Sequence, residues 1–224
     1  NIRWEPARSC HFFVRRMTTH SSLRRVAPAL GLGFLMAFGS SVGQTFFISL
    51  FAGEIRSDFN LSHGGFGALY TAATLVSAVA FLWLGKLTDR FDLSLLSALT
   101  LAGLSGCAVL MASANSLGML CLALFGLRLF GQGLLSHVAI TAMGRWHSNK
   151  RGRALSVATL GYPAGEAILP ILVAFSLTLL TWRGVWVGAA FGMIVIMLPM
   201  LLWLGRLVRV RGLDRPQNDN TESE

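Results

Sequence analysis

Six long apolar runs, separated by short polar segments, account for most of this chain. A transmembrane helix needs about 20 mainly apolar residues, at a rise of about 1.5 Å per residue. The runs predict six spanning helices, at about residues 29–52, 66–84, 93–114, 118–143, 154–179 and 185–204. The sequence therefore predicts an all-α polytopic membrane protein whose bundle of six transmembrane helices covers residues 29–204.

Polar tails are expected on both sides of this bundle. Residues 1–28 predict a cytoplasmic N-terminal tail, and residues 205–224 predict a second cytoplasmic segment that is disordered or part of a central loop. The chain begins with Asn, and Met17 starts an ordinary polar lead into the first span. We therefore expect residues 1–16 to be an upstream extension.

The positions of Lys and Arg predict the orientation of the bundle. Cytoplasmic loops of membrane proteins carry an excess of these residues. Sixteen of the 19 flank the ends that share one side: Arg3, Arg8, Arg15, Arg16, Arg24, Arg25, Lys86, Arg90, Arg145, Lys150, Arg151, Arg153, Arg206, Arg209, Arg211 and Arg215. The opposite loops hold only Arg56 and Arg183, and Arg128 lies inside the fourth run. Both termini are therefore predicted to be cytoplasmic, and the short loops are typical of a bacterial inner-membrane protein.

Composition supports a lipid environment and excludes several classes of protein. Charged residues make up 13% of the chain and hydrophobic ones 54%, whereas a soluble domain usually carries about 25% charge. The net charge of +9 is spread between the apolar runs, so it does not form the compact basic face of a nucleic-acid-binding protein. Cys10, Cys107 and Cys121 have neither metal-ligand spacing nor a disulfide pattern. No metal or other cofactor is expected.

The loop after the second span carries a recognisable motif. Residues 85–92 read Gly-Lys-Leu-Thr-Asp-Arg-Phe-Asp, which resembles the Gly-x-Leu-Ala-Asp-Arg-x-Gly loop of the major facilitator superfamily. Gly85, Leu87, Asp89 and Arg90 match, whereas Asp92 stands in place of the second glycine. The resemblance implies a loop that latches the two halves of a transporter together. The alternative is an ordinary positively charged turn.

Two further stretches resemble the same superfamily. The fourth run contains Arg-Leu-Phe-Gly-Gln-Gly at residues 128–133, similar to the fourth-helix pattern of these transporters. Residues 144–170 resemble members that handle organic anions, although Glu166 stands where the antiporter signature has proline. The resemblance implies a six-helix half-bundle of two inverted three-helix repeats, the N-terminal half of a twelve-span transporter. A missing C-terminal half or a second copy would then complete the cavity.

Two ionisable side chains lie deep inside the predicted spans. A charge near the bilayer midplane costs at least about 2.5–3.5 kcal/mol, so Arg128 and Glu166 are functional candidates. Their depths, roughly 15 and 18 Å from the two opposite surfaces, place them at similar levels of the bilayer. We expect them to form an ion pair that an anionic solute disrupts. The alternative is a permanent pair that keeps the fourth and fifth helices in register.

Four other polar residues are weaker candidates for substrate binding or coupling. His137 suits a proton relay or, more simply, a histidine that packs between helices. Gln44 lies in a polar stripe of the first span that predicts either cavity lining or hydrogen bonds between helices. Tyr70 and Tyr162 are similar candidates.

The function predicted from these features is secondary active transport of a small, anionic organic solute by alternating access. One alternative is an intramembrane enzyme, but Gly39-Ser40-Ser41 lacks the glycine that a serine-protease elbow requires. A channel is disfavoured by the lack of a filter-like repeat. The remaining alternative is a truncated membrane protein without activity.

Overall fold

The structure, a computed structural model, describes residues 19–146 and 151–210, and every regular element in that part of the chain is a helix. The predicted all-α fold class is therefore confirmed. The helices are, in chain order, α2 (Thr19–Ser40), η1 (Ser41–Gly43), α3 (Thr45–Ser49), α4 (Ala52–Asp58), α5 (His63–Leu84), α6 (Leu87–Arg90), α7 (Leu93–Ser113), α8 (Leu117–Leu127), η2 (Arg128–Leu135), α9 (Ser136–Trp146), α10 (Arg151–Thr159), α11 (Gly161–Leu177), α12 (Trp182–Gly192), η4 (Met193–Met197) and α13 (Leu198–Val210).

These elements join into six helices that are long and apolar enough to cross a membrane, as the sequence predicts. Spans 1 to 6 are Ala27–Ser49, His63–Arg90, Leu93–Ser113, Leu117–Trp146, Arg151–Leu177 and Trp182–Val210. Several run beyond the predicted apolar limits, because helical hydrogen bonding continues into the charged ends. The predicted tails fall mainly on residues 1–18 and 211–224, which lie outside the described residues.

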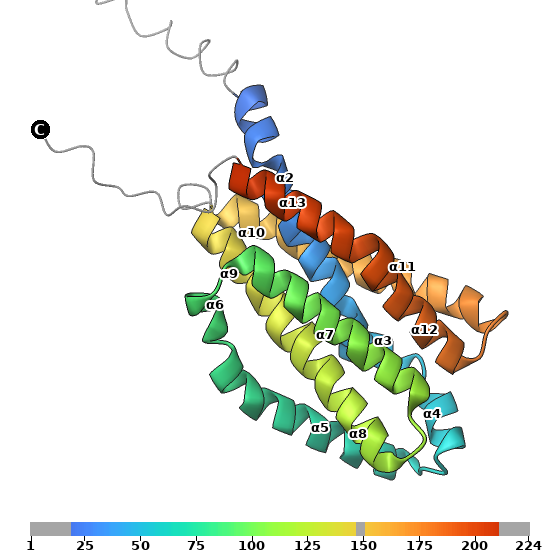
Figure 1. Ribbon diagram of the computed structural model, residues 1–224. Helices are drawn as coiled ribbons and strands as arrows, with labels where there is room; N and C mark the ends of the chain where they lie inside the picture. Colours follow the sequence, from blue (N-terminus) through green and yellow to red (C-terminus); the bar gives the residue numbers. More distant parts are fainter. Residues whose placement is uncertain (1–18, 147–150, 211–224) are drawn as a thin grey trace, which may run out of the picture.

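Span 1 forms the centre of the bundle (Figure 1). Its helix α2 packs against α9, α10, α11 and α13, while α7 packs against α8, α12 and α13. Helix α5 lies at one flank and contacts mainly α8 and η2. Burial follows this arrangement, because 67% of the span 1 window is buried but only 11% of the span 2 window. Span 2 therefore exposes most of its length to lipid or to another protein surface.

Glycines allow spans 1 and 4 to cross at very short range. A Cβ atom added to Gly131 would lie 2.6 Å from the Cα atom and 3.0 Å from the backbone nitrogen of Gly43. Real side-chain carbons do not approach a backbone that closely, so this crossing requires glycine at both positions. The contact places the first residue of η2, Arg128, directly against span 1.

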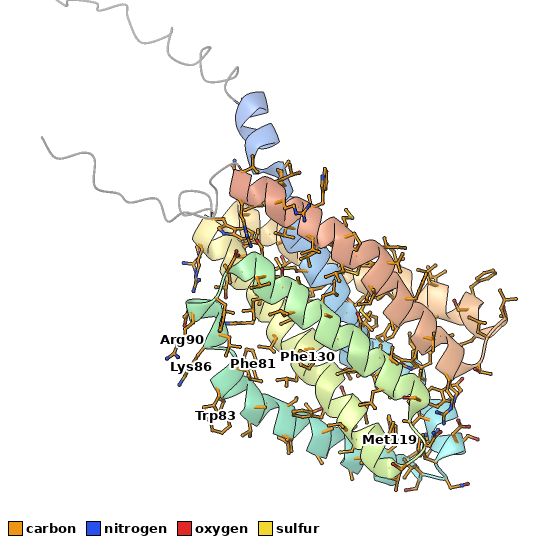
Figure 2. All side chains as sticks on the ribbon, in the orientation of Figure 1. Phe81, Trp83, Lys86, Arg90, Met119 and Phe130 are labelled. Atoms are coloured by element: carbon orange, nitrogen blue, oxygen red, sulfur yellow. The ribbon has the colours of Figure 1, made fainter. Side chains whose placement is uncertain are left out.

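The cationic residues of the described chain lie mainly at one end of the bundle. Figure 1 shows the start of α2 and the end of α13 at the same end as α6 and the end of α9. Figure 2 shows Lys86 and Arg90 directed away from the bundle at this end, with Trp83 on the outer side of α5. At the opposite end, Arg183 pairs with Asp58. An even number of spans therefore brings both ends of the described chain to one side.

Candidate functional site

Arg128 is the central residue of the candidate site and is almost fully buried, with 9% of its surface exposed. It is the first residue of the π-helical segment η2, which follows α8 within span 4. Its Nη1 atom donates to Thr45 Oγ1 at 3.2 Å and to the Gly43 carbonyl oxygen at 3.5 Å. The same nitrogen donates to Gln132 Oε1, one helical turn further along. Arg128 therefore links spans 1 and 4.

A break in span 1 supplies one of these acceptors. The backbone turns through η1, becomes extended at Gln44 (φ −84°, ψ 159°) and re-enters a helix at Thr45. An interrupted helix leaves backbone groups without their usual partners, and those groups need others inside a membrane. The Gly43 carbonyl finds one in Arg128. The Gln44 side chain itself donates locally to Ser40 Oγ at 3.3 Å.

Tyr70, on α5, completes the group around Arg128. Its hydroxyl donates to Thr45 Oγ1 at 2.9 Å, and its ring centroid lies 5.6 Å from the Arg128 guanidinium carbon. That distance is within the range of a cation–π contact. Side chains from spans 1, 2 and 4 therefore meet at one polar centre, and Tyr70 takes part in it as a direct neighbour of Arg128.

A cavity of about 360 Å³ extends from this centre between α5 and the second half of span 4. Both sides of its wall carry hydroxyl groups, and the span 4 side adds one amide, one guanidinium and one imidazole. The lining residues are Thr74, Ser77, Ala78, Phe81, Arg128, Gln132, Gly133, Ser136, His137 and Ile140. Arg128 and His137 are nine residues apart, so they stand roughly 13 Å apart along the helix. The cavity can thus present a fixed positive charge and several neutral donors to a small solute.

His137 connects this cavity to the loop that follows α5. Its ring packs edge-on against Phe81, with centroids 5.4 Å apart, and its Nε2 atom lies 3.4 Å from Thr88 Oγ1. Thr88 already donates its hydroxyl proton to the Gly85 carbonyl oxygen. In this contact His137 Nε2 must therefore be the donor and Thr88 the acceptor. These contacts are those of a histidine that joins helices, while the same ring also lines the cavity.

The expected ion pair between Arg128 and Glu166 is not formed. Glu166 is exposed on α11, and neither it nor Tyr162 hydrogen-bonds to another described residue. The neighbouring Gly165 faces span 1, since a Cβ atom there would lie 2.8 Å from Ser41 Cβ. The next residue of a helix points about 100° away, which directs Glu166 out of the six-helix bundle. The depths counted along the two spans are similar, but the two side chains point in different directions.

Arg128 therefore lacks a carboxylate partner among the described residues. The ion pairs of that part of the chain are Arg145–Asp89, Arg183–Asp58 and Arg209–Asp92. The Nε–H group of Arg128 is buried and has no hydrogen-bond partner there. A buried charge without a counter-ion is costly, which makes Arg128 the most unusual charged residue among those described.

The loop that carries the superfamily motif, residues 85–92, lies at the end of the bundle where Thr88 contacts His137. Asp89, on α6, pairs with Arg145 at the end of α9 at 2.7 Å, and both side chains are largely exposed. Such exposed pairs contribute only about 0.2–1 kcal/mol. Gly85 ends α5, Leu87 begins α6 and Arg90 ends it. A latch between two halves of a transporter stays a prediction for these four residues.

Asp92, which departs from the family pattern, has two contacts of its own. Its carboxylate accepts from the Ser94 backbone N–H at 2.8 Å and so caps α7. It also pairs with Arg209 at the end of α13. The helix cap explains why an acidic residue suits the position where the motif usually has glycine.

Sequence reasoning missed several partners in the site. Thr45 and Gln132 both contact Arg128, and Thr88 contacts His137. Gln132 lies four residues after Arg128, a spacing that brings two side chains of a helix together, so this contact had a signal in the sequence. Thr45 and Thr88 belong to other spans, and nothing in the local sequence indicates their pairing. Among the described residues, no group of three or more His, Cys, Asp or Glu side chains is placed to hold a metal ion.

Comparison with known protein families agrees with this architecture. The family model of the Major Facilitator Superfamily matches residues 33–223, which is most of the chain. Comparisons with curated proteins and with solved structures gave no significant match. The match runs through all six spans and includes the loop at Gly85 and the arginine-containing segment of span 4. This chain therefore belongs to the Major Facilitator Superfamily of solute transporters and has the six helices of one half-bundle.

Proposed function

We propose that this protein carries a small organic anion across the membrane by secondary active transport, with Arg128 as the residue that binds the anion. The observation that carries the proposal is the buried guanidinium that faces a cavity without a carboxylate partner among the described residues. A carboxylate binds Arg through two parallel charge-assisted hydrogen bonds, which are stronger than neutral ones. The anionic solute supplies the counter-ion for Arg128.

The size and lining of the cavity support a small solute. Its volume of about 360 Å³ lies near the lower end of the usual 300–1,000 Å³ for ligand sites. Thr74, Ser77 and Ser136 place hydroxyl groups on the wall, while Phe81 and Ile140 supply apolar surface. A compact carboxylate with a short carbon skeleton suits this combination.

Arg128 also gives a route by which solute binding moves helices. It donates to the Gly43 carbonyl and to Thr45 at the break of span 1, and Thr45 in turn accepts from Tyr70 of span 2. A carboxylate that takes over the Arg128 donors releases these contacts. Ligands shift a conformational equilibrium only through such differential contacts, so this exchange is the step that couples binding to alternating access.

The depth and exposure of Glu166 indicate that span 5 does not face lipid at this position. It lies 11 residues from the end of that span, roughly 16 Å inside, and is exposed. An ionised side chain that faced lipid at this depth would cost at least about 2.5–3.5 kcal/mol. We infer that this face of α11 meets a water-filled cavity or a protein partner, either a second six-helix half or a second copy of this chain.

The orientation follows from the distribution of cations. Lys86 and Arg90 lie at the same end of the bundle as the ends of α9 and α13, which carry Arg145 and Arg209, whereas Arg183 lies at the start of α12 at the other end. By the positive-inside rule, the cation-rich end is cytoplasmic, as expected for a bacterial inner-membrane protein. His137 and the loop with Asp89 are then at the cytoplasmic end of the solute pathway.

Uptake into membrane vesicles tests the proposed function. Radiolabelled small carboxylates would be compared with neutral solutes of similar size, in vesicles that contain the wild-type chain, Arg128→Lys, Glu166→Gln or the control Arg153→Gln. Arg153 is exposed on α10, so its substitution removes a charge without touching the cavity. We expect carboxylate-selective uptake that falls at least tenfold in Arg128→Lys, because Lys cannot reproduce the paired donors of Arg. Full activity in Arg128→Lys would refute the role of Arg128, and full activity in both Arg128→Lys and Glu166→Gln would leave neither intramembrane charge with a part in transport.

A further inference from the structure

A separate hollow lies where the start of α7 meets the last turns of α13. Its volume is about 130 Å³. The lining residues are Ser94, Leu95, Leu202, Gly205, Arg206 and Arg209. We call it the α7–α13 groove. None of these residues belongs to the Arg128 cavity, so the groove needs an explanation of its own.

The electrostatics of the α7–α13 groove favour an anion. Arg206 and Arg209 are exposed and lie three residues apart on one face of α13. The 21-residue helix α7 begins beside them, and the start of a helix carries partial positive charge. Asp92 opposes these charges through its pair with Arg209, but Arg206 forms no ion pair within the described residues. The local balance therefore remains positive.

Ser94 supplies a second and independent indication of a ligand. Only 7% of this residue is exposed, and its hydroxyl oxygen has no hydrogen-bond partner among the described residues. Hydroxyl groups later in α7 have hydrogen-bond partners, since the Ser97 hydroxyl donates to the Ser94 carbonyl and the Thr100 hydroxyl donates to the Ser97 carbonyl. Ser94 is the second residue of α7, where no preceding turn of that helix offers a carbonyl. Ser94 lines the groove, and its buried hydroxyl lies beside Gly205 of α13.

The position of the groove matches the headgroup layer of a membrane. Span 6 has 29 residues, a length of roughly 43 Å, against a hydrocarbon core of about 30 Å. Arg206 lies four residues, roughly 6 Å, from the end of this span, which places it at the edge of the hydrocarbon core. Leu95 and Leu202 line the groove and are 48% and 43% exposed, and Leu99 continues the exposed apolar surface one turn deeper along α7.

We infer that the α7–α13 groove binds an anionic phospholipid, with the phosphate between Arg206 and the Ser94 hydroxyl and an acyl chain along Leu95 and Leu99. Basic pockets between transmembrane helices are suited to anionic lipid headgroups. The phosphate accepts a hydrogen bond from the Ser94 hydroxyl and balances the charge of Arg206. The apolar strip gives a lipid an advantage over a free phosphate ion.

Native mass spectrometry of the purified chain in detergent tests this inference. The probes are short-chain phosphatidylglycerol, phosphatidylcholine with the same acyl chains, and glycerol phosphate, which carries the phosphate without acyl chains. The variants are Arg206→Gln and Ser94→Ala, with Arg153→Gln as a charge-matched control at the same end of the bundle. We expect phosphatidylglycerol to bind more tightly than the other two probes. Its affinity should fall about fivefold in Arg206→Gln and about two- to tenfold in Ser94→Ala, and stay unchanged in Arg153→Gln.

Three results would overturn the inference. Arg206→Gln and Arg153→Gln could weaken phosphatidylglycerol binding equally, which would mean a general charge effect. Phosphatidylcholine could bind as tightly as phosphatidylglycerol, or glycerol phosphate could do so, which would exclude an anionic lipid site. Arg128→Gln should leave lipid binding unchanged, so the outcome is independent of the proposed transport function. Circular dichroism and size-exclusion chromatography would establish that the variants are folded.

Discussion

Replacing Gly131 with alanine tests the close crossing of spans 1 and 4 that places Arg128. The added Cβ atom would lie 2.6 Å from Gly43 Cα, 3.0 Å from Gly43 N and 3.2 Å from Leu104 Cδ1. The first two atoms belong to the backbone, so a side-chain rotation cannot relieve the clash. The helices must move apart, which weakens the contact between Arg128 and the Gly43 carbonyl.

The expected cost follows from the size of the clash. Forcing one extra methyl group into a close-packed contact typically costs about 1–3 kcal/mol. Any alanine in a helix also gains up to about 1 kcal/mol over glycine. Gly106→Ala is the matched control, because it gains the same propensity on α7 and its Cβ atom would have no neighbour within 4 Å. The difference between the two variants therefore isolates the cost of the crossing.

Thermal unfolding of the purified variants in one detergent measures this difference. For a chain of 150–250 residues, each kcal/mol corresponds to about 2–4 °C in Tm. We expect Gly131→Ala to unfold about 2–12 °C below Gly106→Ala. Equal Tm values would show that spans 1 and 4 are not held at this short range, and the described setting of Arg128 would then be wrong.

Substitutions at three further positions test other contacts by the same unfolding measurement. Arg183→Gln should lower stability by about 1–3 kcal/mol, because Arg183 donates at 3.0 and 2.6 Å to the carbonyls of Ala112 and Ala114 at the end of α7; a Tm equal to the wild-type value would contradict this. Trp186→Ala should cost about 3–5 kcal/mol, since this indole is fully buried, and an undiminished Tm would argue against its packing. Asp92→Ala should cost about 1 kcal/mol through loss of the α7 cap, whereas Asp92→Asn keeps an oxygen acceptor and should cost less. Equal costs would mean that the ion pair with Arg209, which both variants lose, matters more than the cap.

The spans could be predicted from the sequence because lipid leaves few alternatives. A backbone inside hydrocarbon must satisfy its own hydrogen bonds, so each apolar run of about 20 residues is expected to be a helix. Depth along a span also follows from counting residues. Arg128 could therefore be identified as an unusual intramembrane charge before any contact was known.

The partner of Arg128 could not be predicted, because counting residues does not fix the direction of a side chain around its helix. Glu166 has a suitable depth, but Gly165 packs against span 1 and turns Glu166 outward. Arg128 turns instead toward Thr45 and Tyr70. These directions depend on how all six helices pack, and no local pattern specifies that.

The break of span 1 at Gln44 and the π-helical turn at η2 were also beyond sequence reasoning. Both lie at the close contact between Gly43 and Gly131, where the backbone departs from α-helical geometry. The glycines of span 1 indicate close packing, but they do not say which helix approaches. Irregular helical turns of this kind often occur at functional sites, which agrees with the position of Arg128.

Calorimetric titration of the purified chain with small carboxylates would measure anion binding at Arg128 directly. Acetate, lactate and benzoate would be compared with acetamide, lactamide and benzamide, which have similar shapes without the charge. We predict saturable binding of at least one carboxylate, no comparable binding of its amide, and an affinity at least tenfold lower in Arg128→Gln. Equal binding of a carboxylate and its amide, or unaltered carboxylate binding in Arg128→Gln, would contradict it.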